Sequence, residues 1–154
     1  MAITERDQQL FMTAALDESR RALPACRPNP PVGCVIVRDG LIVARGFTGE
    51  PGQPHAEAAA LLALGGGFDP MPLTMFVTLE PCAFDGRTPS CARGIVAAGI
   101  RTVYVGTIDP DPRNSGAGIE IMQAVGIEVR VGVLENQVLE FLSPYLLRPS
   151  QRVT

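Results

Sequence analysis

The sequence predicts a three-layer α/β/α fold around a central mixed sheet of about five strands. Three observations lead to this prediction: an Asp-Gly turn between two apolar strands, two later passages in which a short helix ends at a glycine before a strand, and amphipathic helices towards both ends. Alternating strands and helices imply parallel pairing through crossover helices, whereas the first hairpin is antiparallel. The length of 154 residues suits one domain, which we expect to span residues 1–154.

The first part of the chain is expected to contain a helix, a hairpin and a second helix. Thr4 to Asp7 has the form of a capping box, and the apolar face after it predicts a helix that ends before Pro24. A proline-rich loop over residues 26–31 then leads into the hairpin. The expected elements are the first helix, strands 32–37 and 41–47, and a helix over residues 56–64.

The second part of the chain alternates strands with helices. Two passages, residues 97–100 and 124–127, each join a helix to a strand through a glycine that ends the helix. The last helix is amphipathic, and Pro144 leaves open whether it is interrupted. The expected elements are strands 73–79, 100–105 and 127–131 and helices 90–98, 118–125 and 133–147.

Charge and residue usage exclude several classes of protein. All 13 basic residues are arginine and the net charge is −3, which argues against a basic module that binds nucleic acid. No apolar run approaches the roughly 18–20 residues of a membrane helix, and the N-terminus is charged where an export signal would be apolar. We therefore expect a cytoplasmic protein with no nucleic-acid or membrane partner.

The rarest residues carry the strongest functional signal. His55 is the sole histidine, and it flanks the expected strand 73–79 together with two of the four cysteines, Cys82 and Cys91. Taken singly, each would more often be a polar cap or a buried thiol. Together they supply an imidazole and two thiolates, and three protein ligands on zinc leave a position for water, as in catalytic zinc sites. The sequence therefore predicts a catalytic Zn²⁺ site at these residues.

Glu57 lies two residues after His55 and is expected to be the catalytic proton carrier. Residues at i and i+2 face different directions on a helix, so Glu57 is poorly placed to ligate the same ion but can approach water there from the side. A carboxylate in that place can take a proton from water and deliver it to a leaving group. His-x-Glu with a following Pro-Cys is a signature of zinc nucleobase deaminases.

Other candidates have two interpretations. Asn29 lies between two prolines before the first strand, where its amide can either meet the edge of a heterocycle or form an ordinary Asn-Pro turn. Cys34 and Cys26 are expected to be a core thiol and a loop thiol, with neither bound to metal. The three glycines at 65–67 favour a helix stop over a phosphate-binding loop.

The motifs resemble the cytidine deaminase superfamily and, within it, the pyrimidine deaminases of riboflavin biosynthesis. The resemblance covers almost the whole chain and rests mainly on residues 27–37, 54–57, 78–82 and 86–91. The eight residues between the two zinc cysteines are similar to the riboflavin branch, whereas cytidine deaminases keep only two.

The resemblance implies zinc-dependent hydrolytic deamination of an amino-pyrimidinone or a related small heterocycle, with Glu57 carrying the protons. The favoured substrate is the diaminopyrimidinone ribosyl phosphate of the riboflavin pathway. The alternatives are another base or nucleoside, such as guanine or cytosine, and a non-catalytic zinc-binding scaffold. The resemblance also implies a homo-oligomer of two or four chains. The substrate contacts it implies are Asn29, Ala56, Glu80, Pro81, Arg87 and Thr88.

Departures from the family's pattern bear on the substrate. The family typically has Ser-His after the zinc cysteine, whereas this chain has Ala83, Phe84 and Asp85, and the roles of Phe84 and Asp85 are left open. The family also tends to have a histidine after the second strand, where this chain has Phe47, Thr48 and Gly49, and lysine is absent. These departures make the expected pocket less favourable to phosphate unless Arg87 compensates. The bacterial relatives usually carry a reductase domain as well, and we expect none here.

Overall fold

The structure is a computed structural model that describes residues 3–66, 71–86 and 89–146. Its helices are α1 (Glu5–Arg20), α2 (Ala56–Leu64), α3 (Cys91–Ala97), α4 (Ala117–Ala124), α5 (Glu135–Leu142) and the short 3-10 helix η1 (Ser143–Tyr145). Its strands are β1 (Gly33–Arg38), β2 (Leu41–Phe47), β3 (Leu73–Leu79), β4 (Thr102–Thr107) and β5 (Glu128–Val131). Within the described residues, no helix has the length and apolarity needed to cross a membrane.

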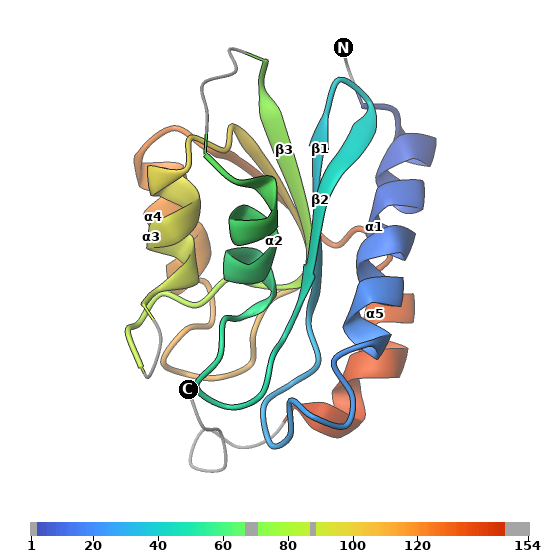
Figure 1. The fold of residues 1–154 in the computed structure, drawn as a ribbon, viewed down its shortest axis with the longest axis vertical. Coiled ribbons are helices and arrows are strands. Elements are labelled where there is room, and N and C mark those ends of the chain that lie inside the picture. Colours follow the sequence, from blue (N-terminus) through green and yellow to red (C-terminus); the bar gives the residue numbers. More distant parts are fainter. Residues whose placement is uncertain (1–2, 67–70, 87–88, 147–154) are drawn as a thin grey trace.

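The five strands form one mixed sheet between two layers of helices (Figure 1). Helices α1 and α5 cover one face, and α2, α3 and α4 cover the other. The strand order is β2-β1-β3-β4-β5, with antiparallel pairing from β2 to β3 and parallel pairing from β3 to β5. The predicted α/β/α architecture, including its antiparallel start and parallel continuation, is confirmed.

Local signals in the sequence account for the first elements. Thr4 accepts a hydrogen bond from the Asp7 N–H at 3.1 Å, and the Asp7 carboxylate accepts one from the Thr4 N–H at 3.2 Å, which completes the predicted capping box. Asp39 and Gly40 have φ values of 51° and 75°, so both residues of the hairpin turn adopt the left-handed conformation that a tight turn requires. Strand β1 begins and ends one residue later than expected.

The last helix is shorter than the predicted span of residues 133–147. It begins only at Glu135, because Leu134 has a left-handed backbone with φ of 53° and Gly132 has φ of 103°. It ends at Leu142, and Pro144, which has no N–H to donate to the preceding turn, lies in η1 instead. The interruption at Pro144 that the sequence left open is therefore present. The expected end at residue 147 lies outside the described residues.

Helix α1 packs unusually close to β1. A Cβ added to Gly33 would lie 1.8 Å from the backbone oxygen of Ala15 and 2.5 Å from the backbone nitrogen of Ser19. Both atoms belong to the helix backbone, which cannot move aside as a flexible side chain would. Glycine at position 33 therefore sets the distance between the helix layer and the sheet.

Gly33→Ala is expected to lower the free energy of unfolding by about 1–3 kcal/mol, because the added methyl forces α1 away from the sheet. Gly94→Ala is the matched control, since a Cβ there meets no atom within 4 Å and alanine is the better helix former. Urea denaturation measures both variants. A Gly33→Ala protein as stable as the wild type would contradict this account of the packing.

Candidate functional site

Three elements converge at one edge of the sheet and bring the sole histidine to two cysteines. His55 is the N-cap residue of α2, Cys82 follows the end of β3, and Cys91 is the first residue of α3. His55 lies 27 residues before Cys82, and Cys91 lies nine residues after it, but each of the three lies where its element starts or stops. The turns at that edge therefore place the imidazole and both thiols together, as the sequence predicts.

The three side chains have the spacing of a metal site. Nδ1 of His55 lies 3.3 Å from Sγ of Cys91 and 3.9 Å from Sγ of Cys82. One ligand atom from each residue lies within 4.8 Å of the other two, and no other metal-ligating residue joins the cluster in the described part of the chain. Ligands of a tetrahedral zinc ion lie about 3.5 Å apart when their bonds are ~2.0–2.3 Å long. The cluster therefore fits zinc.

The hydrogen bonds of the cluster favour negative charge on Cys82. Its sulfur accepts a hydrogen bond from the Cys91 N–H at 3.3 Å. The pKa of Cys82 is lowered to about 5, first because the Cys91 thiol donates to its sulfur and then because His55 does. The same contact with Cys82 raises the pKa of His55. Cys82 is therefore the thiol most ready to supply the thiolate that a metal requires.

Glu57 is buried beside the cluster without belonging to it. It is only 4% exposed, and it lines the same cavity as His55 and Cys82. Burial raises the pKa of Glu57 to about 7, and the negative charge of Cys82 adds to the shift. A carboxyl group in this environment exchanges protons near neutral pH.

The cavity in front of the cluster is lined by residues from both halves of the chain. Asn29 is 7% exposed and lies in the lining, as do Thr48 and Asp109. Phe84, two residues after Cys82, adds an aromatic ring. The other described lining residues are Pro30, Val32, His55, Glu57, Leu79, Glu80 and Cys82.

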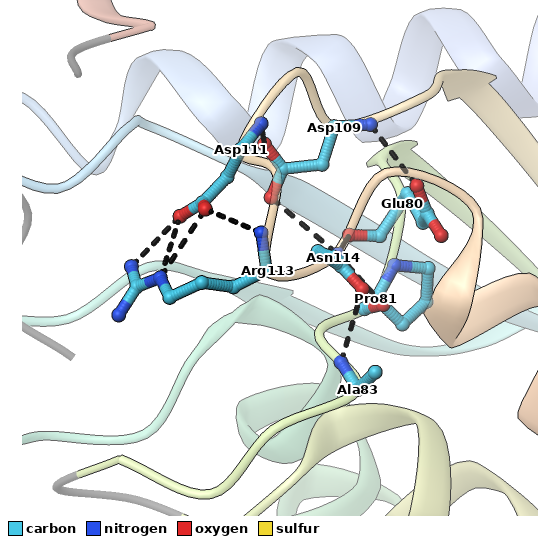
Figure 2. Close-up of polar contacts among 7 residues, drawn as sticks. All are labelled: Glu80, Pro81, Ala83, Asp109, Asp111, Arg113 and Asn114. Atoms are coloured by element: carbon cyan, nitrogen blue, oxygen red, sulfur yellow. Dashed lines mark hydrogen bonds and ion pairs between the residues drawn. The ribbon is translucent and has the colours of Figure 1, made fainter. Parts of the chain in front are cut away.

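A buried carboxylate ties the segment before Cys82 to α4. Oε1 of Glu80 accepts the Asp109 N–H at 3.1 Å (Figure 2), and it also accepts the Gly116 N–H at 2.9 Å. Oε2 accepts the N–H groups of Gly116, Gly118 and Ile119 at 2.9, 3.1 and 3.3 Å. Glu80 therefore satisfies the N–H groups at the start of α4, a role for which a carboxylate is well suited.

Asn114 completes this connection from the other side. Its amide nitrogen donates to the Pro81 carbonyl at 3.2 Å, and its oxygen accepts the Ala83 N–H at 3.1 Å (Figure 2). The same oxygen accepts the Gly118 N–H at 3.1 Å. Asn114 is thus bonded to the residue before and the residue after Cys82, which fixes the loop that carries this thiol.

A second set of contacts holds the loop between the two cysteines. The Ser90 hydroxyl donates to the Cys82 carbonyl at 2.9 Å and accepts the Arg93 N–H at 3.3 Å, so it also caps α3. Oδ1 of Asp85 accepts the Ser90 N–H at 2.7 Å. Asp85, whose role the sequence left open, therefore tethers this loop.

A family model for the cytidine and deoxycytidylate deaminase zinc-binding region matches residues 5–107, a span that contains His55, Glu57, Cys82 and Cys91. The chain belongs to this deaminase family. Among curated relatives of this chain, the riboflavin biosynthesis protein RibD of Haemophilus influenzae is 42% identical over 92% of this chain and 38% of its own length. The maize riboflavin biosynthesis protein PYRD is 42% identical over 96% of this chain and 37% of its own.

Solved structures agree with this assignment. The diaminohydroxyphosphoribosylaminopyrimidine deaminase/5-amino-6-(5-phosphoribosylamino)uracil reductase of Thermotoga maritima superposes with a TM-score of 0.86 at 42% identity. The match covers 92% of this chain and 41% of that protein. The chain thus spans about two fifths of these relatives, and the predicted resemblance to the riboflavin branch of the family is confirmed.

The structure describes most of the candidate site residues that the sequence suggests. Asn29 and Glu80 line the cavity, whereas Ala56 and Pro81 are buried and are not among its described lining residues. Arg87 and Thr88 lie outside the described residues. Cys26 and Cys34 are buried free thiols outside the cluster of His55, Cys82 and Cys91.

The sequence patterns indicated no role for Thr48, Asp109 or Asn114. Asp109 had a usable signal: it follows β4 as Glu80 follows β3, and neighbouring parallel strands end at one edge of a sheet. No signal in the sequence indicated the role of Asn114, because its contacts depend on where α4 begins.

Glu80→Gln is expected to lower the free energy of unfolding by about 1–3 kcal/mol, because the amide NH₂ would face N–H donors and leave them unsatisfied. Glu128→Gln is the control, since Glu128 is exposed and forms one ion pair with Arg130, so its loss should cost less than about 0.5 kcal/mol. Equal effects of the two variants in chemical denaturation would contradict the role given to Glu80.

Proposed function

We propose that this chain is a zinc-dependent hydrolytic deaminase of a small amino-pyrimidinone, with the diaminopyrimidinone ribosyl phosphate of the riboflavin pathway as its substrate. The observation that carries the proposal is the burial of Glu57 in the same cavity as His55 and Cys82. A purely structural metal site has no use for such a carboxylate. The names of the riboflavin-pathway relatives support the choice of substrate.

His55, Cys82 and Cys91 would hold the zinc ion, since their spacing and the charge on Cys82 suit it. When bound, zinc lowers the pKa of water and so supplies a nucleophile near neutral pH. Three protein ligands are the number found in catalytic sites.

Glu57 carries the protons of the reaction. Water adds to the ring carbon that bears the exocyclic amine, and the Glu57 carboxylate takes a proton from that water and gives it to the ring nitrogen. Glu57 then takes the proton of the added hydroxyl and delivers it to the amine, so that the bond from carbon to the amine breaks, the carbonyl forms and ammonia leaves. Since Glu57 is buried, these transfers are shielded from bulk solvent.

The ring is held by groups around the cavity. The Asn29 amide can donate to and accept from a heterocycle edge, and it lines the cavity together with Glu80. We assign backbone contacts to Ala56, Glu80 and Pro81. Arg87 and Thr88, which lie outside the described residues, are the contacts proposed for the ribosyl phosphate.

One observation favours the second candidate, a deaminase of an unphosphorylated base or nucleoside such as guanine or cytosine. The described lining includes three carboxylates, those of Glu57, Glu80 and Asp109, and none of its described members is a lysine or an arginine. A phosphate would meet a negative field there unless Arg87 neutralises it. A zinc-binding scaffold without catalysis is disfavoured by the buried Glu57.

The proposal includes the organisation expected from the sequence. Residues 1–154 act as a single deaminase domain. We expect it to work as a homo-oligomer of two or four chains in the cytoplasm, on a small heterocycle as substrate.

The ligand assignment predicts the zinc content of single variants. His55→Ala and Cys91→Ala should each hold well below one zinc per chain, because two remaining ligands bind weakly. Cys26→Ala should keep the wild-type content, since Cys26 is buried away from the cluster. Metal analysis after dialysis measures this, and full zinc occupancy in His55→Ala would contradict the assignment.

Glu57→Gln is expected to keep its zinc while losing about 10²–10⁴-fold in the rate of ammonia release, because the amide cannot carry a proton. Ammonia release is measured with four candidate substrates: the riboflavin precursor, guanine, cytosine and cytidine. Glu140→Gln, an exposed change in α5, is the control and should retain the wild-type rate. Unchanged turnover in Glu57→Gln, or no turnover of any compound by the zinc-loaded wild type, would contradict the proposed function.

A further inference from the structure

The ring of Phe84 separates the cavity from an arginine. Phe84 is half-buried and lines the cavity two residues after Cys82. The guanidinium carbon of Arg113 lies over the Phe84 ring, 4.4 Å from its centroid. Arg113 is 42% exposed and is not among the described lining residues of the cavity. The Phe84 ring therefore forms part of the cavity wall, and the arginine packs against this ring.

Arg113 is itself held in place. Its Nη2 lies 2.7 Å from Oδ2 of Asp111, and its Nε lies 3.2 Å from both carboxylate oxygens (Figure 2). The Asp111 side chain is fully buried. The planar guanidinium is thus fixed by several hydrogen bonds to one carboxylate, an arrangement that restricts it far more than a single contact would.

The backbone around Phe84 is fixed as well. The Ala83 N–H donates to Asn114 at 3.1 Å, and Asp85 accepts the Ser90 N–H at 2.7 Å. Tethers on both sides of Phe84 and an arginine against its ring leave this side chain little freedom. Because the Phe84 side chain is already ordered, ligand binding loses little of its conformational entropy, which favours affinity.

The charge of the stack is balanced. Arg113 contributes one positive charge, and the buried Asp111 paired with it contributes one negative charge. The wall therefore presents a neutral aromatic surface to the cavity. Such a surface suits the C–H face of a sugar or a flat uncharged group, and it does not distinguish a phosphorylated ligand from an unphosphorylated one.

We propose that Phe84 is the binding contact for the substituent on the substrate's heterocycle, and that Arg113 is a positioning residue that holds the ring in place. This proposal rests on the deaminase function above. The ring of the substrate reacts at the buried end, beside Glu57 and Cys82, so its substituent extends past the partly exposed Phe84. Asp111 and Arg113 act only through the position of that ring.

Binding to zinc-loaded Glu57→Gln protein tests the proposal without turnover. The two probes are the diaminopyrimidinone ribosylamine 5′-phosphate and the same compound after phosphatase treatment. When Phe84→Ala is introduced into the Glu57→Gln protein, Kd should rise about tenfold for both probes, as expected for the loss of an aromatic contact. Phe84→Tyr, which keeps the aromatic face, should stay within about twofold, and Phe84→Leu, which keeps bulk without the flat ring, should resemble Phe84→Ala.

Arg113→Ala should raise Kd about threefold for both probes. The double variant Phe84→Ala/Arg113→Ala should bind the probes no more weakly than Phe84→Ala alone, because Arg113 acts through the Phe84 ring. Arg20→Ala is the matched control: Arg20 stacks on Phe141 at 4.8 Å in the opposite helix layer, and its loss should leave Kd unchanged. In the Glu57-containing enzyme, Phe84→Ala should raise KM with kcat nearly constant.

Several outcomes would overturn the proposal. The first two are an unchanged Kd in Phe84→Ala and a lack of binding to either probe when Phe84 is intact. The third is that the effects of Phe84→Ala and Arg113→Ala add in the double variant. The fourth is an Arg113→Ala effect confined to the phosphorylated probe, which would make Arg113 a phosphate ligand. Failure of the proposed function is distinguishable. Failure of the proposed function would mean that the wild-type protein releases no ammonia. The pattern of Kd values tests the roles of Phe84 and Arg113 whether or not ammonia is released.

Discussion

The carboxylate of Glu80 accepts backbone N–H groups from four residues, and the rest of the site depends on this interaction. It joins the end of β3 to the start of α4, which supplies no metal-ligating residue. The approach is so close that a Cβ on Gly118 would lie 1.9 Å from the Pro81 oxygen. Because Cys82 follows directly, its position is set by how α4 docks against the neighbouring strand. Helix α4 therefore positions Cys82, although it contributes no metal ligand of its own.

The parallel half of the sheet explains why the chemistry gathers at one edge. Strands β3 and β4 pair with Leu79 opposite Thr107, so the loops that follow them start side by side. One loop carries Cys82 and Phe84, and the other carries Asp109. The antiparallel half adds Thr48 after β2. Burial of the Glu57 carboxyl in this setting costs stability, which is typical of groups retained for function.

The sequence predicted what depends on local pattern. The capping box at Thr4 and the turn at Asp39 need only neighbouring residues, and the metal cluster needed only rare residue types beside one strand. The late start of α5 escaped prediction because the left-handed backbone of Leu134 has no local signature. The stack of Arg113 on Phe84 escaped it because two separate loops must meet. Local chemistry was therefore predictable, whereas contacts between loops were not.

The central claim is that water replaces an amine on the substrate ring, with Glu57 carrying the protons. Turnover of the diaminopyrimidinone ribosyl phosphate in ¹⁸O-labelled water, followed by mass spectrometry and an ammonia assay, tests it most directly. The account predicts one ¹⁸O atom in each product molecule and one ammonia released with it. Ammonia release without ¹⁸O in the product, or no reaction by the zinc-loaded protein, would contradict the account.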